Sequence, residues 1–104
     1  MTEYFIETNK KVIKKIVISG HAEYAPKGED IVCASVSTAI IMTVNQIEIF
    51  DLLKNVALKI EEGYFQIEVL KDNDIINKLL INLEYTLNDL EINFKKYIKK
   101  TKEA

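Results

Sequence analysis

The sequence is poor in the residues that form disulfides, metal sites and irregular chains: it has one cysteine, one histidine, one proline, three glycines and no tryptophan. A single cysteine excludes an internal disulfide, so the chain suits a reducing compartment. One cysteine and one histidine supply too few ligands for a structural zinc site, and no glycine-rich phosphate-binding motif occurs. The scarcity of proline and glycine also argues against a linker. We therefore expect a folded protein without a metal ion or other cofactor.

Charge of one sign is not in excess either. The chain has 14 basic and 16 acidic residues and a formal net charge of −2, which does not indicate a nucleic-acid binder. Lysines gather between residues 95 and 102, and we expect a solvated end there rather than an RNA-binding tail. The N-terminus lacks the pattern of a signal peptide, and polar residues interrupt the apolar stretch from Ile31 to Phe50. These features predict a cytoplasmic protein that contacts no membrane.

The length of 104 residues, 48% of them hydrophobic, suits one globular domain spanning residues 1–104. Two stretches near the N-terminus alternate as strands do, Met1 to Glu7 and Lys11 to Ser19. The second has β-branched residues on both faces, with Ile16 on one and Ile13 on the other, so we expect it inside a sheet. A helix is predicted from Ile31 to about Asp51, and its narrow polar stripe predicts that it is largely buried.

A hairpin is expected next, with alternating strands on either side of a turn at Glu62-Gly63. A second helix starts at Asp72-Asn73-Asp74 and shows apolar residues at three- and four-residue spacings. Its end is open, because Tyr97 to Lys100 suits either a last helical turn or a short closing strand. The order ββαββα, with or without a final β, predicts an α+β fold. Two helices would pack against a mostly antiparallel or mixed sheet of four or five strands.

The chemistry of the sequence gathers around its only cysteine. Asp30 is typical of a helix N-cap, which makes Cys33 the third residue of the first helix. The free N–H groups of a first helical turn favour an anion, so a thiolate is favoured there. Those amides, including that of Cys33, are also candidate donors to an oxyanion. This position suits a nucleophilic thiol.

The only histidine lies in the chain just before that helix. His21 ends the second strand, and a loop of residues 22–29 leads to Asp30. The loop can double back, which would bring the imidazole within hydrogen-bond reach of the sulfur as a general acid and base. Ser37 lies one helical turn beyond Cys33 and is a candidate partner for His21 or the substrate. We also expect the loop to reorder when substrate binds.

Ordinary structural roles explain the same residues. A lone cysteine on an apolar helix is often a packed core residue, and a lone histidine is often a surface residue. On that interpretation the chain is a non-catalytic interaction module, either ribosome-associated or regulatory, with Cys33 in the core. Composition and spacing leave both hypotheses open.

One continuous pattern extends from Gly20-His21-Ala22, through a short loop, to Asp30-Ile31-Val32-Cys33-Ala34-Ser35-Val36-Ser37. It resembles the signature of the ribosomal-processing cysteine proteases, the Prp family of small bacterial enzymes, and the order of elements and chain length are similar too. One departure lies at Phe94-Lys95, where the family often has a Tyr-Pro pair before a last strand. Without proline the second helix is able to run on.

The resemblance implies a cysteine endopeptidase that removes an N-terminal extension from a large-subunit ribosomal protein, cutting next to aromatic residues. It implies Cys33 as the nucleophile and His21 as the general acid and base. It also implies a homodimer, which the residues themselves neither favour nor oppose. The expected substrate-binding or supporting residues are Gly20, Asp30, Ala34 and Ser37.

Overall fold

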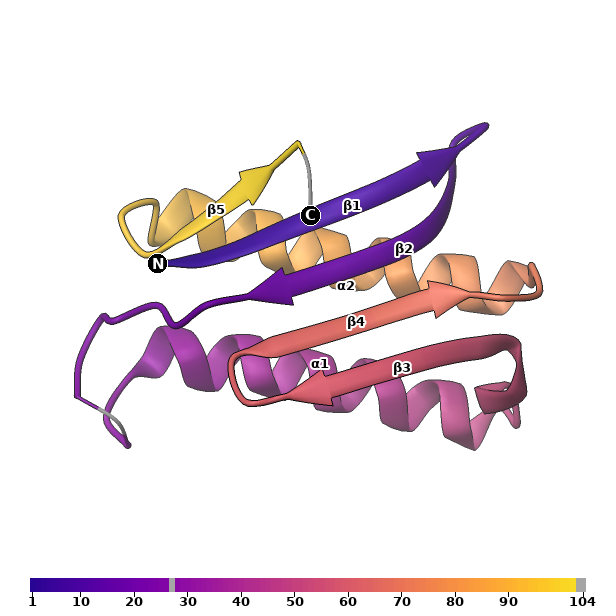
Figure 1. Ribbon diagram of the computed structural model, residues 1–104, viewed down its shortest axis with the longest axis horizontal. Helices are drawn as coiled ribbons and strands as arrows, with labels where there is room; N and C mark the ends of the chain where they lie inside the picture. The colour runs from indigo at the N-terminus through magenta and orange to yellow at the C-terminus, as the bar shows by residue number, and fades with distance from the viewer. Residues whose placement is uncertain (27, 103–104) are drawn as a thin grey trace.

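The computed structural model describes residues 1–26 and 28–102, which form two helices on one face of a five-stranded sheet (Figure 1). The elements in chain order are β1 (Thr2–Asn9), β2 (Val12–Ser19), α1 (Ile31–Ile49), the short 3₁₀ turn η1 (Leu53–Asn55), β3 (Val56–Glu61), β4 (Tyr64–Val69), α2 (Asp74–Asn93) and β5 (Ile98–Thr101). The α+β class and the order ββαββα with a final β are therefore confirmed.

The strands are arranged in the order β3-β4-β2-β1-β5. Neighbouring strands are antiparallel except β5, which pairs parallel to β1. The sheet is thus mixed, and β2 lies at its centre as its apolar faces predicted. The edge strands are β3, which lies over α1, and β5 (Figure 1).

The β1–β2 hairpin corrects one prediction about which residues share a face. Its register shifts between Glu7 and Thr8, which pair with Lys15 and Ile13. Such a bulge adds one residue to a strand and reverses the faces beyond it. Ile13 and Ile16 consequently belong to the same core cluster, 3% and 0% exposed, whereas Val17 is not part of it. Their predicted placement on opposite faces is wrong, because alternation holds only along a regular strand.

Helix α1 is less buried than its composition predicted. Its buried residues are Val32, Val36, Thr43 and Ile47, whereas Ile31 and Met42 are 52% and 57% exposed. The prediction of a largely buried helix is wrong for this chain, because α1 lies on an open face of the sheet and is covered from one side. Among the described residues, α1 also has the length and mean hydropathy, 1.4, of a membrane-crossing helix. Val32, Val36 and Ile47 of this helix belong to the core cluster that it shares with the sheet and α2.

Helix α2 ends before β5 although no proline stops it. Asn73 caps its start by accepting hydrogen bonds from Ile75 and Ile76 N–H, and the helix ends at Asn93. The buried Tyr4 hydroxyl donates to Glu91 Oε1 at 2.6 Å, while Glu91 Oε2 accepts from the Lys100 N–H at 3.1 Å. Burial and then the Glu91 hydrogen bond raise the pKa of Tyr4. Glu91 thereby joins β1, α2 and β5, which favours the closing strand.

Candidate active site

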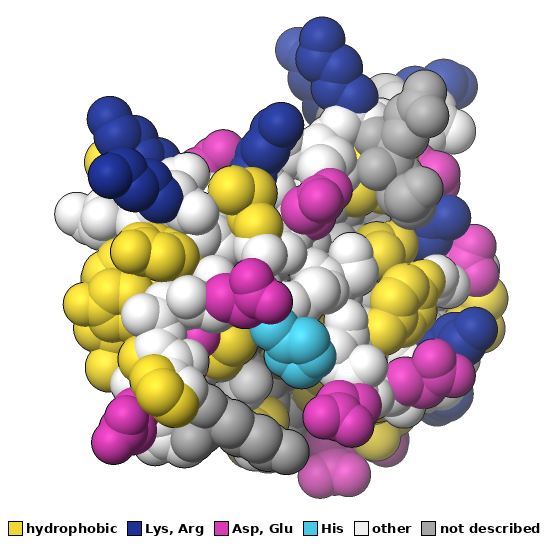
Figure 2. All heavy atoms as spheres, turned by 60° about the vertical axis from the view of Figure 1, so that its left-hand side comes forward, with side chains coloured by type: hydrophobic (Ala, Val, Ile, Leu, Met, Phe, Trp, Pro, Cys, Tyr) yellow, Lys and Arg dark blue, Asp and Glu magenta, His cyan; other side chains and the backbone are white. Residues whose placement is uncertain are grey.

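The end of β2 places His21 beside the β3–β4 turn. Gly20 has a φ of +88°, and a side chain there would run into the Met1 carbonyl oxygen, so glycine is required. The Gly20 N–H donates to the Gly63 carbonyl oxygen at 2.9 Å. This hydrogen bond fixes the backbone before His21 to the hairpin turn. The His21 side chain lies at the surface, among acidic and hydrophobic side chains (Figure 2).

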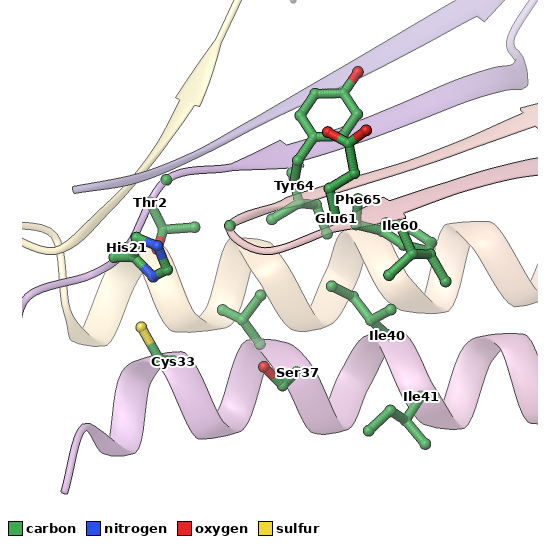
Figure 3. A pocket seen from close by; sticks show the side chains of 14 residues that line it. Thr2, His21, Cys33, Ser37, Ile40, Ile41, Ile60, Glu61, Tyr64 and Phe65 are labelled. Atoms are coloured by element: carbon green, nitrogen blue, oxygen red, sulfur yellow. The ribbon is translucent and has the colours of Figure 1, made fainter. Parts of the chain in front are cut away.

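The start of α1 places Cys33 in the first helical turn, as the sequence predicted. Asp30 caps the helix: its Oδ1 accepts hydrogen bonds from the Val32 and Cys33 N–H groups at 2.9 and 3.0 Å. Val32, which is 0% exposed, anchors this turn in the core. Cys33 is half-buried, and its sulfur points toward the His21 ring (Figure 3). The thiol is therefore not enclosed in the core.

The loop between His21 and Asp30 folds back onto the cysteine. The Ala22 N–H donates to Cys33 Sγ at 3.3 Å, and the Tyr24 N–H donates to Asp30 Oδ2 at 2.9 Å. The Tyr24 ring packs against Phe94 and Tyr97, with centroids 5.8 and 5.0 Å away. Ala22 and Tyr24 thus anchor the first part of the loop. The prediction of a reordering loop stays untested, and Lys27 within it lies outside the described residues.

The hydrogen bonds to the Asp30 carboxylate favour its ionised form. Partial desolvation acts to raise its pKa, but hydrogen bonds from the backbone N–H groups of Cys33, Tyr24 and Val32, and from the Cys33 side chain, outweigh it. The pKa of Asp30 consequently lies below its ordinary value. The carboxylate is ionised at neutral pH and occupies the Cys33 amide. The Cys33 amide, one of the predicted oxyanion donors, is thus already engaged by the helix cap, and its role as an oxyanion donor stays a prediction.

His21, Cys33 and Ser37 stand where two clefts meet. One cleft, of about 300 Å³, lies between α1 and the β3–β4 hairpin, and Ile40, Ile41, Ile60 and Phe65 make much of its wall apolar (Figure 3). The other, of about 750 Å³, lies on the loop side and is lined by acidic residues and by Gly28 and Ala34. Its acidic residues are Glu23, Asp30 and Glu62.

The predicted supporting residues are brought to the same place with different contacts. Asp30, Ala34 and Ser37 line the loop-side cleft, and Gly20 and Ser37 line the apolar one. Within the described part of the chain, Ser37 makes no hydrogen bond to His21. No group of three or more potential metal-ligating side chains occurs among the described residues. The hairpin's contribution, from Ile60 to Phe65, was not predicted, because only the fold brings that turn to the cysteine.

A thiol at a helix start, facing an imidazole where two clefts meet, is an arrangement that cysteine proteases use. A comparison with protein families matches residues 1–99 to the family described as cysteine protease Prp. The chain belongs to this family and is a cysteine protease. The hypothesis of a non-catalytic module is thereby set aside. A comparison with curated proteins gives no match.

Solved structures share the fold over nearly the whole chain. An essential ribosomal processing protease Prp from Staphylococcus aureus, in complex with a covalently linked product peptide, is 24% identical. That match covers 99% of this chain and 100% of the other, with a TM-score of 0.89. A protein from Streptococcus mutans is 25% identical, with 99% and 96% of the chains covered and a TM-score of 0.80.

Proposed function

We propose that this chain removes an N-terminal extension from a large-subunit ribosomal protein, with Cys33 as the nucleophile and His21 as the general acid and base. The observation that carries the proposal is the meeting of the only cysteine and the only histidine at the junction of two clefts. The family match and the ribosomal processing protease of Staphylococcus aureus support the substrate class.

The reaction follows from the proposed roles. The Cys33 thiolate attacks the carbonyl carbon of the scissile peptide bond, and the His21 imidazolium gives its proton to the leaving amine as the C–N bond breaks. This leaves the extension on Cys33 as a thioester. His21 then takes a proton from a water molecule, whose oxygen attacks the thioester carbonyl and releases the extension as a carboxylate. The Ala22 N–H, 3.3 Å from the sulfur, stabilises the thiolate before attack.

The clefts suit a peptide that carries aromatic residues beside the cut. The apolar wall of Ile40, Ile60 and Phe65 offers a surface for aromatic side chains on one side of the scissile bond. On the other side, Ser37 and the loop-side cleft accept the adjoining peptide. In this proposal Gly20 and Asp30 are supporting residues: the Gly20 backbone positions His21, and the Asp30 carboxylate caps the helix that carries Cys33.

The test is cleavage of a peptide that copies the extended N-terminus of the large-subunit ribosomal protein from the same genome. We expect one cut by the wild-type protein, read by mass spectrometry, and none by Cys33→Ser. Asn93→Ser, at an exposed α2 position, is the matched polar control and should cut normally. An intact peptide with wild-type protein, or undiminished cutting by Cys33→Ser, would contradict the proposal.

A homodimer is a further part of the proposal. Exposed apolar side chains at the end of α1 and in the segment that follows it form an end surface, with Ile49, Phe50 and Leu53 exposed by 78%, 52% and 36%. A second copy presenting the same surface would cover these side chains. The expected mass in light scattering is that of two chains, falling to one chain in Ile49→Asp. Ile92→Asp, an exposed helix position elsewhere, should stay dimeric. A monomeric wild-type protein would end this part of the proposal.

The lone thiol also supports a location. A reactive cysteine with no partner cysteine stays reduced in a reducing compartment, so we propose that the enzyme works in the cytoplasm. Fractionation of cells that produce the tagged chain tests this: the protein should be recovered with cytoplasmic markers, and recovery with membranes would contradict it.

A further inference from the structure

We propose that Gly63 is a positioning residue: the missing side chain in the β3–β4 turn makes the room in which the His21 imidazole is held for catalysis. A Cβ atom built on Gly63 would lie 2.9 Å from His21 Nε2 and 3.3 Å from Cε1. The ring therefore occupies the space that any other residue at this position would need. This inference rests on the proposed role of His21.

The turn that carries Gly63 is fixed relative to the histidine. Its carbonyl oxygen accepts the Gly20 N–H at 2.9 Å, and the next residue, Tyr64, pairs with Ser19 across β2 and β4. The same short turn thus fixes the backbone before His21 and packs against the side of the ring that carries Nε2. The sulfur of Cys33 faces the ring from the direction of α1 (Figure 3). The turn therefore lies against one edge of the ring and limits the positions that the ring can take relative to the cysteine.

A left-handed backbone by itself does not account for glycine at this turn. Gly63 has a φ of +69°, a region in which most side chains are disfavoured. In the β1–β2 turn of the same sheet, however, Lys10 and Lys11 have φ values of 53° and 68°. The chain thus accepts a side chain at nearly the same φ where nothing comparable to the imidazole stands beside it. What distinguishes position 63 is the ring.

The atoms that would yield to a side chain at position 63 belong to a rotatable ring, not to the backbone. A Cβ at position 63 would lie 2.9 Å from His21 Nε2, whereas an ordinary van der Waals contact begins at 3.4 Å, so Nε2 would have to move by about 0.5 Å. The fold accommodates this easily, but the reaction does not, because a displacement of about 1 Å in a catalytic group is able to cost roughly a hundredfold in rate. We expect a loss of roughly tenfold or more, carried by kcat.

The experiment compares Gly63→Ala, Gly63→Asn and Lys11→Ala with the wild-type protein. Asparagine tolerates the left-handed region better than alanine and still carries a Cβ, so it separates backbone strain from contact with the ring. Lys11→Ala places an alanine at a φ near that of Gly63 in a turn far from the ring. The measurements are kcat and KM on the ribosomal peptide, and the pH profile of Cys33 alkylation by iodoacetamide. The ring signals of His21, the only histidine, are followed by NMR.

We expect both Gly63 variants to fold, to lose roughly tenfold or more in kcat with KM changed less than about twofold, and to show shifted His21 signals and a shifted alkylation profile. Lys11→Ala should match the wild-type protein. Wild-type activity in Gly63→Asn would show that the glycine serves only the turn, and unfolding of both Gly63 variants would show that the ring does not yield. Either result overturns the inference. If the wild-type protein leaves the peptide intact, the proposed function fails, while alkylation and NMR still decide the role of Gly63.

Discussion

Removing the Asp30 carboxylate should destabilise the protein and also change the rate at which Cys33 is alkylated. In Asp30→Ala the first turn of α1 loses the cap that accepts the Val32 and Cys33 N–H groups, and the loop loses the hydrogen bond from Tyr24. A lost cap costs about 1 kcal/mol, and we assign about 0.5 kcal/mol to the half-exposed loop hydrogen bond. The expected loss is about 1.5 kcal/mol in the free energy of unfolding, or roughly 6–12 °C in Tm for a domain of this size.

The pH dependence of this loss follows from the lowered pKa of Asp30. A carboxylate with a lowered pKa in the folded state stabilises the fold at pH values above its unfolded pKa, whose ordinary value is 3.8. That stabilisation is lost as the pH falls through the folded-state value. The difference between the wild-type protein and Asp30→Ala should therefore be full at pH 7 and shrink from about pH 4 downward.

The assay is urea unfolding from pH 7 to pH 2, together with alkylation of Cys33 at pH 7. Asn73→Ala is the matched control, because Asn73 caps α2 through two similar hydrogen bonds, at 2.9 and 3.2 Å, with a neutral side chain. It should destabilise by a similar amount, equally at all pH values, and leave alkylation unchanged. A difference for Asp30→Ala that stays constant below pH 4, or an equal change of alkylation in both variants, would refute the reasoning.

Three further outcomes are expected. His21→Ala should slow alkylation of Cys33 at pH 6 severalfold, because no imidazolium then supports the thiolate; an unchanged rate would show that His21 does not support the thiolate. Tyr24→Ala should speed amide exchange at residues 22–26 several-fold, since the ring anchors the loop, and exchange as slow as in the wild-type protein would show that the anchor is elsewhere. Tyr4→Phe should lower the free energy of unfolding by about 1–3 kcal/mol, because two half-buried acceptors on α2 lose the hydrogen bond from the tyrosine hydroxyl, as measured by urea unfolding; a loss below about 0.5 kcal/mol would contradict this.

Short-range patterns in the sequence predicted most elements of the fold. Alternation gave the strands, the carboxylate of Asp30 gave the start of α1, and Glu62-Gly63 gave the β3–β4 turn. Errors arose where a distant element decides the outcome. The bulge at Lys14, between the pairs Glu7–Lys15 and Thr8–Ile13, moved Ile13 into the core. The sheet covers α1 from one side, so apolar residues along that helix face solvent.

The same distinction between local pattern and distant contact holds for the site. The sequence by itself determined that one thiol stands in the first turn of a helix and that one imidazole closely follows the preceding strand, because caps and strand ends depend on residues close in the chain. Only the tertiary structure decided that the Ala22 amide reaches the sulfur, that Asp30 already holds the Cys33 amide, and that Gly63 lies against the His21 ring. Residues 21 and 63 are brought together by the pairing of β2 with β4. That pairing follows from the packing of the whole sheet, which no local pattern specifies.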